Sequence, residues 1–392
     1  MGTGIAMAFA DAHIAVRVFD ESREALDRAR ATIARTYASQ LERGRIDAVE
    51  RDVRIAAIEL SSDAGFATGA DMAIEAVFED PALKAEVFAR LGRLLPPDAL
   101  LATNTSTLDV DAIAAGAPHP ERCLGMHFFS PANVMRLLEI VRGAKTSPAA
   151  VSAAVALGRR IGKVPVVVGN CDGFVGNRML LGYRREAEFA VLAGAAPAQI
   201  DGALERFGFA MGPFAVADLA GIDVGWRAKM ERIKRGGAPP FAVSNFPDAL
   251  VAAGRLGQKA GKGWYRYVPG DRSRHDDPDV AALVATERSR SGIAPRTVTD
   301  DEIVERCVYA LVNEGARILE EGIADSAADI DAIWVNGYGF PKARGGPMQY
   351  ADGAGLAKVA ATIAAFAQTD PAFWRPAPLL VRLAESGGAF TR

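Results

Sequence analysis

The stretch His13–Arg45, "HIAVRVFDESREALDRARATIARTYASQLERGR", decides the fold. Its first eight residues form a short apolar run that ends in an acid, which is typical of a buried strand. The remaining residues have the pattern of a long charged helix that closes near Gly44. A strand that leads directly into such a helix opens a βαβ unit. The sequence therefore predicts a parallel sheet with crossover helices.

Strand and helix patterns continue to alternate as far as about residue 170. Strands are expected in "ADMAIEAVF" (Ala70–Phe78) and "LLATNTS" (Leu100–Ser106), with the helix "PALKAEVFARLGRLL" between them. Pro81 starts that helix, where its missing N–H costs least. Three more short strands follow in "RCLGMHFFSP", "MRLLEIVRG" and "KVPVVVGN". We therefore predict a doubly wound, Rossmann-type α/β domain over residues 1–170.

The chain after Cys171 is mostly helical in pattern and contains an internal repeat. The two copies align Arg178 with Arg306, Glu186 with Glu314, Asp201 with Asp331, Gly212-Pro213 with Gly346-Pro347, and Asp218 with Asp352. We predict two copies of one all-α unit, over residues 171–268 and 296–392, each of which needs a neighbour to cover its apolar face. The polar stretch "VPGDRSRHDDPD" between the copies is expected to be a linker.

The composition of the chain limits the classes of protein to which it could belong. Half of the 392 residues are apolar and the net charge is −3, which favours two or three globular domains and no nucleic-acid or membrane partner. Three widely spaced cysteines indicate neither a disulfide framework nor a metal site, and they fit a reducing compartment. No apolar run reaches the roughly 18 residues of a membrane span, and no signal peptide is recognisable. We expect a cytoplasmic protein.

The N-terminus has part of a nucleotide-binding motif. Such a fold normally opens with a strand and a G-x-G-x-x-G turn, and "MGTGIAMAFADA" is typical of the last third of that motif. Gly2 would be the third glycine, which allows close helix–strand packing, so the first strand and two phosphate-facing glycines are missing from the pattern. Asp20, after the next strand, can bind ribose hydroxyls and repel a 2′-phosphate, which favours NAD. The alternative is a surface aspartate.

The stretch "GMHFFSPANVMRLLEIV" (Gly125–Val141) resembles the signature of 3-hydroxyacyl-CoA dehydrogenases, with a histidine before two phenylalanines and a glutamate twelve residues later. Oxidising a secondary alcohol needs a base for the hydroxyl proton, and histidine suits that role near neutral pH. A carboxylate on the far ring nitrogen fixes the tautomer and stabilises the imidazolium. We therefore predict His127 as the base and Glu139 as its partner, on neighbouring strands. The alternative is a hydrogen-bonded core histidine.

The resemblance implies roles for further residues. Ser106 in "TNTSTL" would hold the substrate oxygen and the nicotinamide side, and Asn177 in "CDGFVGNRML" would polarise the C3 oxygen of the substrate. The resemblance also implies cofactor contacts for Glu79, Lys84, Ser130 and Lys259. For Ser106 and Asn177 the alternative is hydrogen bonding within a turn or at a helix cap. Glu79 and Lys84 could instead be a solvated pair at a helix start, and Lys259 could be an ordinary exposed lysine.

The implied activity is NAD-dependent oxidation of 3-hydroxyacyl-CoA to 3-oxoacyl-CoA in fatty-acid β-oxidation. The repeated C-terminal unit resembles larger multifunctional members, of which this chain would be the dehydrogenase portion, without the preceding hydratase domain. The second copy has Glu305 where the first has Asn177, so we expect it to be non-catalytic. Two alternatives stay open: a related dehydrogenase of a short hydroxy acid or sugar acid, and an inactive truncated chain kept for assembly. Its macromolecular partners would be a second copy of the chain or other β-oxidation enzymes.

Overall fold

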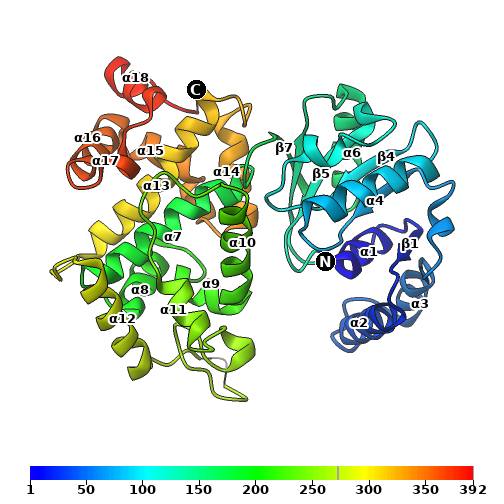
Figure 1. The fold of residues 1–392 in the computed structure, drawn as a ribbon, viewed down its shortest axis with the longest axis horizontal. Coiled ribbons are helices and arrows are strands. Elements are labelled where there is room, and N and C mark those ends of the chain that lie inside the picture. The colour runs from blue at the N-terminus through cyan, green and yellow to red at the C-terminus, as the bar shows by residue number, and fades with distance from the viewer. Residues whose placement is uncertain (272, 392) are drawn as a thin grey trace. The chain divides into compact units, whose positions relative to one another are not determined.

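The computed structural model describes residues 1–271 and 273–391 (Figure 1). They form two compact units: Met1–Asn177 with Glu321–Tyr338, and Arg178–Glu320 with the residues from Gly339 onward. No helix in the described part of the chain is long and apolar enough to cross a membrane. The predicted class, a Rossmann-type α/β unit followed by two repeated helical units, is confirmed, while the domain boundaries at 170, 268 and 296 stay a prediction.

The first unit contains two sheets. β1 and β2 form a parallel pair, and β3 to β7 form a five-stranded sheet in chain order. Their bounds are β1 (Val16–Phe19), β2 (Ile58–Ser61), β3 (Met72–Glu75), β4 (Leu100–Thr103), β5 (Cys123–Phe128), β6 (Leu137–Arg142) and β7 (Val164–Gly169). All six predicted strands are present. β2 is an additional strand of four residues that directly follows a helix, without the turn residues that usually mark a strand.

The predicted parallel sheet contains one reversal, at β6, which runs antiparallel to β5. The connection over residues 129–136 is too short for the crossover of a dozen or more residues that a parallel pair needs. The antiparallel register pairs His127 directly with Glu139. The reversal therefore places the two residues side by side.

The helices of the first unit are α1 (Gly2–Ala10), α2 (Arg23–Glu42), α3 (Ala48–Ala56), α4 (Pro81–Leu94), α5 (Val110–Ala114) and α6 (Pro148–Arg160), with short 3-10 turns η1 (Ala64–Ala67) and η2 (Pro120–Arg122). Helices α2 and α3 pack against β2, whereas both faces of the larger sheet are covered by other helices. Neighbouring strand residues pack on opposite sides: Ala102 joins a core with Ile5 of α1, whereas Leu101 joins one with Phe88 of α4. This two-sided burial is what a doubly wound sheet requires.

Close helix packing at the N-terminus occurs at Gly4 rather than at Gly2. A Cβ atom on Gly2 would lie 4.0 Å from the Cβ of Ala76, which is an ordinary contact. A Cβ on Gly4 would lie 3.2 Å from the backbone N of Ala132, in the loop that joins β5 and β6. The tightest approach of α1 to its surroundings is thus at Gly4, one half-turn after Gly2, and the packing role of Gly2 against a preceding strand stays a prediction.

A segment of the second repeat belongs to the first unit. The Gly169 N–H at the end of β7 donates to the Ile323 carbonyl at 2.7 Å, and Val168 forms an antiparallel bridge with Ala324. Helix α14 (Ala327–Gly337) then packs against β6 and β7. This segment covers the edge of β7, which would otherwise expose unpaired backbone groups.

The repeated helices correspond one to one. The first copy contains α7 (Gly176–Ala193), α8 (Pro197–Phe207), α9 (Pro213–Ala220) and α10 (Ile222–Lys234), and the second contains α13 (Asp300–Glu320), α14, α15 (Pro347–Ala354) and α16 (Leu356–Ala367). The remaining elements are α11 (Phe246–Ala252), η3 (Gln258–Ala260), α12 (Pro278–Ser291), η4 (Lys342–Arg344), α17 (Pro371–Trp374) and α18 (Pro378–Ser386). Of the predicted linker, Arg272 lies outside the described residues, and Asp277 caps α12 by accepting from the Asp279 N–H.

The aligned charged residues of the two copies bind each other. Arg178 donates to Glu314 at 2.6 Å, and Arg306 donates to Glu186 at 3.1 Å. The arginine of each copy thus pairs with the glutamate of the other copy. Such reciprocal pairing is the mark of a two-fold related interface, here within one chain.

Aligned aspartates perform the same task in each copy. Asp218 accepts hydrogen bonds from the backbone N–H groups of residues 264 and 265, at 2.8 and 3.0 Å. Asp352 accepts from those of residues 390 and 391, at 2.8 and 3.0 Å. In both copies the aspartate fastens the segment that ends the repeat, which explains why this position aligns.

Candidate active site

His127 and Glu139 form a buried hydrogen-bonded pair at the end of the larger sheet. His127 Nδ1 lies 2.8 Å from Glu139 Oε2, and the two residues are 5% and 0% exposed. Because an ionised carboxylate can only accept, Nδ1 carries the proton, which leaves Nε2 with a lone pair. The pair therefore holds the ring in one orientation, with Nε2 as the nitrogen that could act as a general base.

The second oxygen of Glu139 is also engaged. Oε1 accepts from the Gly176 N–H at 3.0 Å, at the point where α7 begins. A carboxylate is stabilised at a helix N-terminus. Phe129 and Phe174 flank the imidazole, with ring centroids 4.4 and 5.8 Å from it. Both the carboxylate and the ring are thereby fixed in place.

Ser106 is held by Glu79. Glu79 Oε1 accepts from the backbone N–H of Ser106 at 2.8 Å, from its hydroxyl at 3.1 Å and from the Thr105 hydroxyl at 2.7 Å. Burial raises the pKa of Glu79, but the Thr105 hydrogen bond, the charge of Lys84 and the Ser106 bonds outweigh it, so the pKa lies below its usual value. Glu79 is therefore an anion that orients the turn carrying Ser106.

Lys84 lies behind Glu79 and is only 1% exposed. Its Nζ donates to Glu75 Oε1 at 2.8 Å and lies 3.3 Å from Glu79 Oε2. Glu75, at the end of β3, also accepts from the Thr103 hydroxyl at 2.8 Å. The alternative of a solvated lysine is wrong here, because the ammonium is enclosed by protein and partnered by two carboxylates.

Asn177 lies beside Ser106. Its Nδ2 donates to the backbone carbonyl of Ser106 at 3.2 Å, and its Oδ1 accepts from the Tyr338 hydroxyl at 2.9 Å. The structure thus brings together two of the polar residues that the sequence singled out. It adds Tyr338, which the sequence did not indicate.

Asp20 and Ser130 lie on exposed loops of the same unit. Asp20 follows β1, and its Oδ1 accepts from the Ser22 N–H at 2.9 Å, in the turn that starts α2. Ser130 precedes a cis peptide bond to Pro131, in the loop between β5 and β6. Both side chains are open to solvent, as a ligand contact requires.

Lys259 belongs to the second unit and forms an ion pair with Asp223. Its side chain is 51% exposed. The cofactor contact that the family resemblance implies for Lys259 stays a prediction.

Sequence reasoning missed three residues that shape the site: Glu75, Tyr338 and Lys163. Lys163 donates to the backbone carbonyls of Ala132 and Met135, and so fixes the loop between β5 and β6. An acid that ends an apolar strand was a usable signal for Glu75. No local signal marks Tyr338, because its partner Asn177 is 161 positions away.

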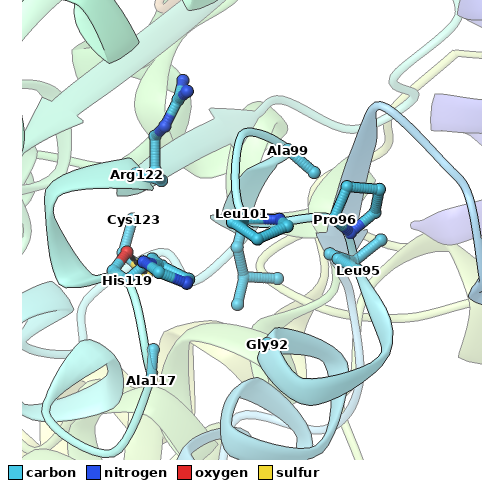
Figure 2. Close-up of a pocket in the computed structure, with 10 residues that line it drawn as sticks. Gly92, Leu95, Pro96, Ala99, Leu101, Ala117, His119, Arg122 and Cys123 are labelled. Carbon is cyan, nitrogen blue, oxygen red and sulfur yellow. Dashed lines mark hydrogen bonds between the residues drawn. The ribbon is translucent and has the colours of Figure 1, made fainter.

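A small hollow elsewhere in the first unit is unrelated to this site (Figure 2). It is lined by Gly92, Leu95, Pro96, Pro97, Ala99, Leu101, Ala117, His119, Arg122 and Cys123. Burial raises the pKa of the Cys123 thiol to about 11, so this cysteine is not a thiolate at neutral pH. None of the residues singled out by the sequence lines the hollow.

A Rossmann-type unit with a buried His–Glu pair, together with a duplicated helical unit, is typical of dinucleotide-binding dehydrogenases. Residues 1–171 match the NAD binding domain of 3-hydroxyacyl-CoA dehydrogenase, and residues 173–267 and 303–390 each match its C-terminal domain. The chain belongs to the 3-hydroxyacyl-CoA dehydrogenase family, and its cofactor is NAD.

Relatives and solved structures agree with this assignment. The chain is 46% identical to a peroxisomal bifunctional enzyme of Danio rerio over 99% of its length and 55% of that protein. It is 36% identical to a fatty acid oxidation complex subunit alpha of Shewanella amazonensis, over 100% of the chain and 54% of that protein. A 3-hydroxybutyryl-CoA dehydrogenase structure from Escherichia coli matches with a TM-score of 0.86 and 28% identity, over 99% of this chain and 97% of that one. The chain spans about half the length of the two relatives.

Proposed function

We propose that the chain interconverts 3-hydroxyacyl-CoA and 3-oxoacyl-CoA with NAD, as the dehydrogenase step of fatty-acid β-oxidation. The observation that carries the proposal is the buried His127–Glu139 pair, whose free ring nitrogen is a base for an alcohol proton. The names of the relatives support the substrate class, since they include a fatty acid oxidation complex subunit and a 3-hydroxybutyryl-CoA dehydrogenase.

Each side chain has a distinct part in the chemistry. In the oxidative direction His127 Nε2 takes the proton of the C3 hydroxyl, and Glu139 stabilises the imidazolium that forms. Asn177 donates a hydrogen bond to the C3 oxygen, which carries increasing negative charge when the reaction runs toward the alcohol. The Ser106 hydroxyl, whose one hydrogen is donated to Glu79 Oε1 in this structure, would hold the same oxygen by turning its O–H away from Glu79. NAD, when bound, accepts the hydride that leaves C3. In the reverse direction His127 returns its proton to the oxygen.

The carboxyl ends of the strands suit a dinucleotide. The residues there are Asp20 after β1, Glu75 at the end of β3, and the turn after β4 that carries Ser106. Dinucleotides bind doubly wound folds at these strand ends, with pyrophosphate at a helix N-terminus. We assign Asp20 to the adenosine ribose and Gly2, at the start of α1, to the pyrophosphate. The residues assigned to the nicotinamide end are Glu79, Ser106, Ser130 and Lys259. Lys84 would act on the cofactor through Glu79.

The test is NADH-dependent reduction of acetoacetyl-CoA by the purified chain, followed by the loss of NADH absorbance. Free acetoacetate and a keto sugar acid, whose ketone NADH can also reduce, serve as the alternative substrates. We expect a kcat/KM for acetoacetyl-CoA at least about a hundredfold above that for the free acids, because remote binding energy of the CoA moiety is used in the transition state. Preference for a free acid would favour the related-dehydrogenase alternative, and absence of both turnover and NADH binding would favour the assembly alternative.

The cytoplasmic location stays part of the proposal. The names of the relatives favour no single compartment, since one is peroxisomal and another is a bacterial complex subunit. We also propose, without a choice between them, two macromolecular partners besides the acyl-CoA substrate: a second copy of the chain and another β-oxidation enzyme. Fractionation of cells of the source organism, followed by size-exclusion chromatography, tests both.

A further inference from the structure

Tyr338 comes from the second helical repeat but lies in the first unit. It directly follows α14, in the segment Glu321–Tyr338. Its ring stacks on Trp334 at 4.8 Å between centroids and meets the edge of Phe129 at 5.5 Å. Phe129 in turn packs against the imidazole of His127. The tyrosine is therefore part of the aromatic wall around the base.

The ring of Tyr338 rests on the backbone where α7 begins. A Cβ atom on Gly176 would lie 2.4 Å from both Cε2 and Oη of Tyr338. Only glycine leaves room for the ring at this position. The N–H of the same glycine donates to Glu139. The position of the tyrosine is thus tied to the helix end that also anchors the His–Glu pair.

The hydroxyl of Tyr338 binds the oxygen end of the Asn177 amide. Nδ2 of Asn177 donates to the Ser106 carbonyl, which can only accept, so the two ends of the amide are assigned without ambiguity. Oδ1 must then accept, and the Tyr338 hydroxyl donates to it at 2.9 Å. Within the described residues, the second N–H of Nδ2 has no acceptor. That N–H is available to an oxygen of a bound molecule.

We infer that Tyr338 is a positioning residue for the reaction: its hydroxyl holds the Asn177 amide so that one N–H faces the C3 oxygen of the substrate. The inference rests on the proposed function for the identity of that oxygen. Tyr338 acts through Asn177 rather than on the substrate. An amide fixed at both ends before the substrate arrives is a preorganised donor, whereas an amide fixed at one end can turn about its side-chain bonds.

The decisive variant is Tyr338→Phe, which removes one oxygen and keeps the ring. Tyr350→Phe is the matched control, because Tyr350 is another half-buried tyrosine packed against phenylalanines, in the second unit. The first measurement is nitrogen-15 NMR of protein labelled at asparagine, with the Asn177 side-chain signals assigned through Asn177→Ala. We expect Tyr338→Phe to shift the Asn177 amide signals and lower their heteronuclear NOE, and Tyr350→Phe to leave both unchanged.

The second measurement is NADH-dependent reduction of acetoacetyl-CoA. Tyr338→Phe should lower kcat by about 2–13-fold, the range of one well-placed neutral hydrogen bond, and change KM by less than about threefold. In an Asn177→Ala background the same substitution should have almost no further effect, because the residue it acts through is gone. A purely structural tyrosine would lower activity equally in both backgrounds.

The two measurements separate this inference from the proposed function. Failure of the parent chain to reduce acetoacetyl-CoA would count against the proposed function, and the NMR comparison would still decide whether Tyr338 holds Asn177. Circular dichroism and thermal unfolding verify that each variant is folded. Asn177 amide signals that are unchanged in Tyr338→Phe, or a loss of kcat that persists in the Asn177→Ala background, would overturn the inference.

Discussion

Glu139 connects the ring of His127 to the first backbone N–H of α7. One carboxylate oxygen lies 2.8 Å from His127 Nδ1, and the other accepts from Gly176 at 3.0 Å. With both oxygens engaged and the residue fully buried, the carboxylate cannot turn away from the imidazole. The tautomer of His127 is therefore set by the junction between a strand and a helix.

Replacing Glu139 with glutamine tests this junction. A glutamine amide can offer one oxygen but not two, so either the Gly176 N–H or the His127 N–H loses its acceptor. We expect Glu139→Gln to lower kcat for acetoacetyl-CoA by about a hundredfold or more, with little change in KM. The control is Glu121→Gln, which disrupts an exposed pair with His119. Equal losses in the two variants would contradict the assignment.

Lys84 is expected to be a major contributor to stability. It is enclosed between two carboxylates, so Lys84→Met leaves Glu75 as a buried charge without its cation. The free energy of unfolding should fall by about 3–5 kcal/mol, and NADH affinity should fall because Glu79 loses its neighbour. Urea unfolding and NADH titration measure the two effects. The exposed Lys145→Met should change the free energy of unfolding by less than about 0.5 kcal/mol.

Asp20 should determine the choice between NAD and NADP. Its carboxylate follows β1 and would bind ribose hydroxyls in NAD but repel the 2′-phosphate of NADP. Asp20→Asn should lower the ratio of kcat/KM with NAD to kcat/KM with NADP by about tenfold or more, which corresponds to about 1.4 kcal/mol. Asp27→Asn on the exposed face of α2 is the control. A parent enzyme that uses NADP as well as NAD would refute the role of Asp20.

Glu302 should make stability depend on acid pH. Arg296 and Arg306 donate hydrogen bonds to it, and these bonds lower its pKa to about 2 against the opposing effect of burial. Its contribution is therefore complete above the unfolded pKa of about 4.3 and is lost as the pH falls toward 2.

Glu302→Gln should therefore cost about 1 kcal/mol of unfolding free energy at pH 7, since the site is partly exposed, and only about a quarter of that near pH 2.5. Urea unfolding of the parent and the variant at both pH values makes the comparison. A cost that does not change with pH would show that the Glu302 carboxylate is not stabilised by the two arginines in the folded state.

The local features of this fold were readable from the sequence, and the long-range ones were not. Buried strands such as β5 and the two helical copies follow from the spacing of apolar residues. The reversal of β6 depends on the short loop that precedes it, and the tight packing at Gly4 depends on Ala132, far along the chain. The enclosure of Lys84 is likewise a property of packing. The spacing of apolar residues along the chain does not predict these contacts.

The candidate site also has one part that the sequence predicts and one part that it does not. The motif around His127 and Glu139 carries a family resemblance, and the antiparallel register brings these two residues together. The link from Asn177 to Tyr338 joins different helical copies, 161 positions apart, so only the folded chain reveals it.

Measuring kcat and KM for NADH-dependent reduction of acetoacetyl-CoA by His127→Ala tests the central claim most directly. If His127 is the base, kcat should fall by about 10²–10⁴-fold while KM changes by less than about threefold, since the imidazole acts in the transition state. Combining it with Glu139→Gln should add little, because the two residues act as one unit. Near-parental turnover by His127→Ala would contradict the assignment of the base and the mechanism built on it.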